Sequence, residues 1–174
     1  MPSIRTILLV EDSPSLARTY EAQLAPLGHR VLAAEDGRTA LALLEREAID
    51  CVLLDLQLPD MDGMEILQAA RARPAAPTVV VITSNASLNT AVKAIRGGAF
   101  DYLVKPFPSA RLLTTLQNAL ESAELKREVE TYRRTIDRAE FCDFLGRSLP
   151  MQLVYRTIEA AAPSSASVFI TGES

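Results

Sequence analysis

Five polar side chains of this 174-residue chain come directly after short apolar runs. They are Glu11 and Asp12 after residues 6–10, Asp55 after residues 51–54, Thr83 after residues 78–82, and Lys105 after residues 102–104. Short apolar runs that alternate with amphipathic stretches are typical of parallel strands buried on both faces. The carboxyl ends of such strands meet at one edge of the sheet, where ligands bind. We therefore expect the five side chains to converge, since chance placement in loops does not explain five polar side chains at four strand ends.

The residue types at this edge predict phosphoryl chemistry on a metal-bound carboxylate. Three converging carboxylates repel one another and need a compensating cation. Oxygen ligands without a cysteine or histidine cluster favour Mg²⁺ (or Mn²⁺) over zinc. A carboxylate beside that ion can attack phosphorus and form an acyl phosphate, while Lys105 and Thr83 stabilise the phosphoryl oxygens. Asp55 is the expected nucleophile because it stands alone, whereas Glu11 and Asp12 are adjacent.

Two rival classes of site fit these residues less well. The turn at residues 11–15 is acidic rather than glycine-rich, so it would repel the phosphates of a dinucleotide or a flavin. A phosphatase with an aspartyl nucleophile needs a second acid two residues later, and Gln57 occupies that position. We therefore expect a phospho-aspartate that persists.

The elements that must position these residues are five strands separated by helices. The expected strands are residues 6–10, 30–33, 51–54, 78–82 and 102–104. The predicted fold is α/β, a doubly wound five-stranded parallel sheet with helices on both faces. At 48% hydrophobic and 23% charged residues with a net charge of −4, the composition is that of a globular chain. The apolar runs are too short for a membrane span or a signal peptide, so we expect a cytoplasmic protein with reduced cysteines.

A helix is expected to run well past this domain. Residues 109–145 contain no glycine or proline, and residues 121–140 hold eleven charged side chains. Apolar residues recur there with coiled-coil spacing at Leu125, Val129, Tyr132, Ile136 and Ala139. Two interpretations stay open, a dimerising seam and a solvated helix with an incidental stripe.

The segments LLVEDSPS, VLLDLQLPDMDG, VITSNAS and FDYLVKPF resemble the receiver domain of bacterial two-component response regulators over about residues 4–120. The resemblance implies the flavodoxin-like, CheY-like strand order 2-1-3-4-5. It also implies a phospho-acceptor at Asp55, a metal held by Glu11, Asp12, Asp55 and the backbone carbonyl of Gln57, and a cis peptide before Pro106. Glu11 stands where many members have Asp.

Further roles follow from the same resemblance. Thr83 and Lys105 would sense the phosphoryl group, and Tyr102 would be an aromatic switch that follows Thr83. Gln57 and Asn85 occupy positions that tune the lifetime of the phosphoryl group. The partner would be a histidine kinase or a histidine phosphotransfer protein. The chain would catalyse its own phosphorylation and slow dephosphorylation.

Residues 144–174 are similar to the opening of the AAA+ domain of NtrC-type activators of sigma-54 RNA polymerase, and most similar to quorum-sensing members of that family. Gly172, Glu173 and Ser174 would begin its phosphate-binding loop, and no ATPase activity is expected because the loop lysine is not in this chain. The expected division is a receiver at residues 1–120, a helical linker at 121–143 and the start of the AAA+ domain at 144–174.

The favoured function is therefore a phosphorylation-dependent response regulator. It would form a homodimer through the receiver or the linker helix and control transcription. It would contact sigma-54 RNA polymerase and DNA only through regions absent from this chain. The alternative is a receiver-like interaction module that signals without phosphate; such modules often lose the acidic pocket, which is present here.

Overall fold

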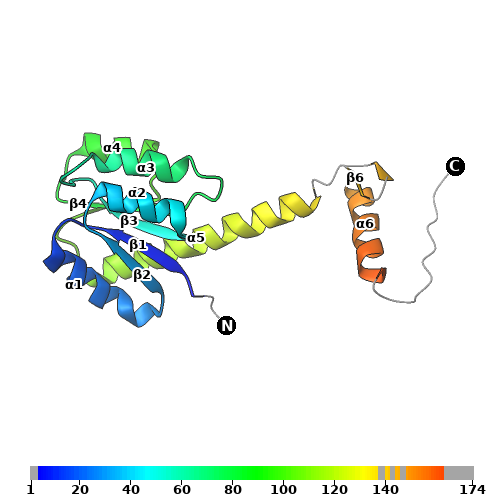
Figure 1. Ribbon diagram of the computed structural model, residues 1–174, viewed down its shortest axis with the longest axis horizontal. Helices are drawn as coiled ribbons and strands as arrows, with labels where there is room; N and C mark the ends of the chain where they lie inside the picture. Colours follow the sequence, from blue (N-terminus) through cyan, green and yellow to red (C-terminus); the bar gives the residue numbers. More distant parts are fainter. Residues whose placement is uncertain (1–3, 137–139, 142–143, 146–147, 163–174) are drawn as a thin grey trace. The chain divides into compact units, whose positions relative to one another are not determined.

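Five strands form one parallel sheet in the order β2-β1-β3-β4-β5, as predicted. The computed structural model describes residues 4–136, 140–141, 144–145 and 148–162. Figure 1 shows the sheet with helices on both sides. The strands are β1 (Thr6–Val10), β2 (Arg30–Ala34), β3 (Cys51–Asp55), β4 (Thr78–Thr83) and β5 (Asp101–Val104). The central strand β3 is buried along its whole length, which explains why its residues do not alternate between apolar and polar.

Alternate residues of the strands pack into two separate hydrophobic cores, one on each face of the sheet. One core joins the sheet to α2 (Gly37–Arg46), α3 (Gly63–Arg71) and α4 (Leu88–Arg96). The other joins it to α1 (Pro14–Leu24) and the first part of α5 (Ser109–Ile136). On β1, Leu8 and Val10 pack in the first core, while Ile7 and Leu9 pack in the second. This three-layer arrangement leaves the carboxyl edge of the sheet to the loops.

Helix starts and turns follow from local chemistry. The side chain of Asp36 accepts a hydrogen bond from Thr39 N (2.7 Å) at the start of α2, and Asp62 accepts one from Met64 N (2.9 Å) at the start of α3. After α1, a short 3₁₀ helix (Ala25–Leu27) ends at Gly28, whose φ of 68° favours glycine.

The long helix expected from the sequence is present as α5. Its first half is amphipathic, and Leu112, Leu116 and Ala119 are fully buried against the sheet. Beyond them, Leu125 is 62% and Val129 is 51% exposed. The first part of α5 therefore packs on the sheet, whereas Leu125 and Val129 do not.

The chain divides into two compact units, Met1–Leu125 and Lys126–Ser174. In the second unit, β6 (Glu140–Phe141) and β7 (Phe144–Leu145) pair antiparallel, and α6 (Leu149–Ala161) has a proline in its first turn. The expected phosphate-binding loop residues Gly172, Glu173 and Ser174 lie outside the described residues, as does Cys142. In the described part of the chain, no helix is both long and apolar enough to cross a membrane.

Candidate functional site

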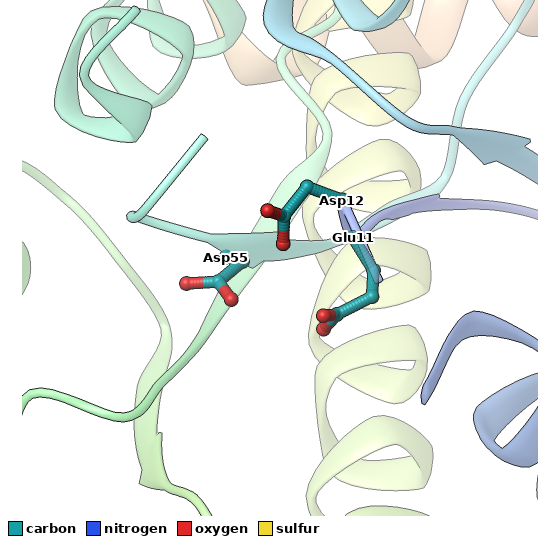
Figure 2. Close-up of side chains that lie close together, drawn as sticks. All are labelled: Glu11, Asp12 and Asp55. Carbon is teal, nitrogen blue, oxygen red and sulfur yellow. The ribbon is translucent and has the colours of Figure 1, made fainter. Parts of the chain in front are cut away.

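The carboxyl ends of two neighbouring strands, β1 and β3, place the acidic residues together. Val10 pairs with Leu54 across β1 and β3, so Glu11 follows its strand beside Asp55. The carboxylates of Glu11, Asp12 and Asp55 each bring an oxygen within 4.8 Å of the others. Figure 2 shows the three side chains lying close together at the ends of β1 and β3. The predicted convergence of these acids is confirmed.

Burial differs among the three acids. Glu11 is 1% and Asp55 is 4% exposed, whereas Asp12 is exposed to solvent. Burial raises the pKa of Glu11 above its ordinary value, because loss of water disfavours the charged form more than the nearby Lys105 favours it. The site therefore holds an anionic charge that the protein alone does not fully compensate.

Lys105 supplies the positive charge in this cluster. Its Nζ lies 2.5 Å from Glu11 Oε2 and 2.6 Å from Asp55 Oδ2. Burial alone would lower the pKa of Lys105, but hydrogen bonds to Asp55 and Glu11 outweigh it and raise that pKa. One ammonium against three carboxylates leaves negative charge in excess. Oxygen donors in this arrangement fit a hard divalent cation such as Mg²⁺.

The backbone aligns Lys105 with the end of β4. Lys105 N donates to Thr83 O (2.8 Å), and the Lys105–Pro106 peptide is cis, as expected. The Lys105 ammonium also lies 5.9 Å from the centre of the Tyr20 ring, which stacks on Phe107. Tyr20 was not among the residues predicted for the site, because its contact with Lys105 depends on tertiary packing.

Thr83 and Tyr102 meet on the backbone of one loop residue. Thr83 is fully buried, and its hydroxyl oxygen accepts a hydrogen bond from Asn85 N (3.2 Å). The Tyr102 hydroxyl donates to Asn85 O. Asn85 in turn accepts from Ser87 N through its side-chain oxygen (2.9 Å). Thr83 and Tyr102, the expected switch pair, are thus joined through the loop between β4 and α4.

Gln57 joins the phospho-acceptor candidate to this same loop. Gln57 N donates to Asp55 Oδ1 (2.9 Å), and Gln57 Oε1 accepts a hydrogen bond of 2.5 Å from the Ser84 hydroxyl. Ser84 was not among the residues predicted from the sequence. Its position directly after Thr83 could have marked it as a site residue, but its hydrogen bond to Gln57 could not be predicted from sequence spacing.

Several hydrogen bonds hold the loop between β3 and α3 in place. Gly63 N donates to Leu56 O (3.0 Å), and a Cβ at Gly63 would lie 2.5 Å from Asp55 O. The carboxylate of Asp60 accepts from Gly37 N (2.8 Å) and Arg38 N (3.0 Å) at the start of α2. These two backbone donors lower the pKa of Asp60. The loop that carries Gln57 is therefore held between α2 and the end of β3.

Comparisons with known proteins agree with this geometry. A family model described as the response regulator receiver domain matches residues 7–117. Regulatory protein LuxO of Vibrio cholerae is 42% identical over 167 residues, which cover 95% of this chain and 36% of that protein. The chain therefore spans about a third of the length of this curated relative.

Two solved structures show the same fold. The signal receiver domain of a putative LuxO repressor protein from Vibrio parahaemolyticus is 35% identical, with a TM-score of 0.71 over 74% of this chain and 98% of that chain. The receiver domain of the sensor histidine kinase PA1611 from Pseudomonas aeruginosa is 34% identical, with a TM-score of 0.62 over 68% of this chain and 99% of that chain. That structure has a magnesium ion coordinated in its active-site cleft. From its sequence, its fold and the edge where its acids meet, the chain belongs to the response regulator receiver domain family.

Proposed function

We propose that this chain accepts a phosphoryl group on Asp55 from a phosphohistidine donor, with Mg²⁺ bound beside it. The observation that carries the proposal is a buried Asp55 carboxylate that shares the Lys105 ammonium with Glu11. A nucleophile of this kind needs its own charge and that of the incoming phosphoryl oxygens balanced at short range.

Each residue of the site would have its own role in the transfer. Asp55 Oδ attacks phosphorus in line, the P–N bond of the donor breaks, and the donor histidine leaves with the bonding electrons and takes up a proton. Lys105 neutralises a phosphoryl oxygen, and Thr83 donates its hydroxyl to another. Glu11, Asp12, Asp55 and the carbonyl of Gln57 would hold Mg²⁺, which supplies Lewis-acid charge to the phosphoryl oxygens.

Transfer would change the surface formed by α4 and β5. If the Thr83 hydroxyl turns toward the phosphoryl group, Asn85 N loses its present acceptor and the loop that Tyr102 contacts is released from one restraint. Large apolar side chains lie exposed on and beside these two elements: Leu88, Val92, Ile95, Phe100 and Val104. A change in this surface, or in a dimer contact through α5, would pass the signal to a sigma-54-dependent ATPase domain that lies outside this chain.

Intact-mass spectrometry after treatment with acetyl phosphate and Mg²⁺ tests the proposal. We expect the wild-type chain to gain one phosphoryl group, EDTA to prevent the gain, and Asp55→Ala to show none. Glu65→Gln, which removes an exposed carboxylate in the first turn of α3, is the matched control and should gain the group as the wild type does.

Two results would contradict the proposal. The absence of a mass gain in the wild type would favour the module that signals without phosphate. An equal gain in Asp55→Ala would place the modification on another residue.

A further inference from the structure

A single hydrogen bond bridges the two loops that border Asp55. Asp55 pairs with Ile82 in the register of β3 and β4, and Gln57 and Ser84 each lie two residues beyond this pair. The Ser84 hydroxyl donates to Gln57 Oε1 across the gap at 2.5 Å. The bridge is therefore the first side-chain link between the loops beyond the Asp55 carboxylate.

Both ends of the bridge are anchored to residues of the site. Gln57 N donates to Asp55 Oδ1, which ties the backbone of Gln57 to the carboxylate. Ser84 lies between Thr83 and Asn85, and Asn85 N donates to the Thr83 hydroxyl oxygen. Neither Gln57 nor Ser84 is buried, so their side chains meet at the solvent side of the site.

In-line displacement places two species in the same position. When Asp55 Oδ attacks a donor, the leaving group departs opposite to the new O–P bond. When the acyl phosphate is hydrolysed, water attacks phosphorus from that same side, the P–O bond to Asp55 breaks, and the carboxylate leaves as the water gives its proton to solvent. Leaving group and water must both occupy the outward position between the two loops.

We infer that Ser84 is a positioning residue which, through its hydrogen bond to Gln57, holds the Gln57 side chain across this outward position and slows both reactions. The inference rests on the proposed function of Asp55. It extends the control of phosphoryl lifetime from Gln57 and Asn85, where the resemblance implied it, to the Ser84 hydroxyl. Loss of the Ser84 hydroxyl frees Gln57 and opens the position to water and to small donors.

The test measures two rate constants, phosphorylation by acetyl phosphate and hydrolysis of the purified phosphoprotein, both in excess Mg²⁺. We expect Ser84→Ala to raise each about fivefold, the change that loss of one ordinary hydrogen bond produces. Ser84→Thr keeps the hydroxyl and should restore both rates. Ser87→Ala, in the same loop, removes a hydroxyl that makes no cap hydrogen bond and is the matched control.

Coupling to Gln57 is tested in a Gln57→Leu background, which keeps the bulk but removes the acceptor. There, Ser84→Ala should leave both rates unchanged. An unchanged rate in Ser84→Ala alone, or an equal effect with and without Gln57, would overturn the inference. A fall in the phosphorylation rate would also overturn it, because damage to the acidic cluster slows transfer whereas opening the outward position speeds it. If the wild type itself gains no phosphoryl group, the proposed function fails instead.

Discussion

Burial alters the acid–base chemistry of Glu11. It is fully buried, and burial raises its pKa above the ordinary 4.5 despite the contact with Lys105. The folded protein therefore holds a proton on Glu11 more tightly than the unfolded chain does. Its contribution to stability is fully present below about pH 4.5 and is lost as the pH rises through the higher pKa of the folded state.

Glu11→Gln should accordingly stabilise the protein at neutral pH in magnesium-free buffer. The amide cannot ionise, so the melting temperature should rise by about 2–4 °C, the shift produced by about 1 kcal/mol in a domain of this size. The difference should shrink toward pH 4. Thermal unfolding followed by circular dichroism measures it, with Glu65→Gln as the exposed control.

Magnesium should reverse the order of the two proteins. Added Mg²⁺ is expected to raise the melting temperature of the wild type more than that of Glu11→Gln, because binding to the folded state alone stabilises it. If Glu11→Gln does not raise the melting temperature at pH 7 without Mg²⁺, burial of the charged Glu11 does not destabilise the fold. If the variant responds to Mg²⁺ as the wild type does, Glu11 is not part of the metal site.

Among the elements, the loop from β3 to α3 depends on one glycine. A Cβ at Gly63 would lie 2.5 Å from Asp55 O and 2.6 Å from Leu56 Cα, and both of these are backbone atoms that cannot turn aside. The absence of a side chain at Gly63 therefore allows α3 to begin against the end of β3.

Gly63→Ala should lower the free energy of unfolding by about 1–3 kcal/mol, the usual cost of overpacking. It should also slow phosphorylation, because relief of the contact displaces Asp55. Urea unfolding and the acetyl phosphate assay measure the two effects. Gly28→Asn is the control, because Asn tolerates positive φ and a Cβ at Gly28 meets nothing within 4 Å. Equal losses in both variants would disprove a specific role for Gly63.

At this scale the sequence was a good guide to the sheet and a poor one to cross-loop contacts. The strands, their order and the meeting of Glu11, Asp12 and Asp55 follow from apolar runs and from the common edge of parallel strands. The hydrogen bond between Ser84 and Gln57 could not be predicted, because it depends on where two loops lie in space. The roles expected for Thr83, Tyr102 and Asn85 stay predictions.

For the whole molecule, α5 raises the question of assembly. Leu125 and Val129 are one helical turn apart and largely exposed, and the sequence places Tyr132 and Ile136 in the same stripe. Exposed apolar residues at this spacing fit a helix that pairs with a second copy. We propose that this stripe carries a homodimer contact.

The double variant Leu125→Glu with Val129→Glu should weaken dimerisation by at least about tenfold, because each buried side chain contributes about 1.5 kcal/mol or more. Sedimentation velocity over a concentration series measures the change. Glu128→Ala, an exposed change on the same helix, should leave association as it is. Identical sedimentation of the double variant and the wild type would assign the stripe to a solvated helix.

Asp60 fixes the length of the loop that follows β3. Its carboxylate accepts from two consecutive backbone amides at the start of α2, while Gly63 N closes the loop on Leu56 O. One residue inserted before Asp60 would displace that carboxylate by about 3.3 Å, enough to break both contacts with α2. The length of this loop is therefore fixed. Substitutions can change its side chains, but an insertion or deletion would break the hydrogen bonds between Asp60 and the start of α2 and so release the segment that carries Gln57.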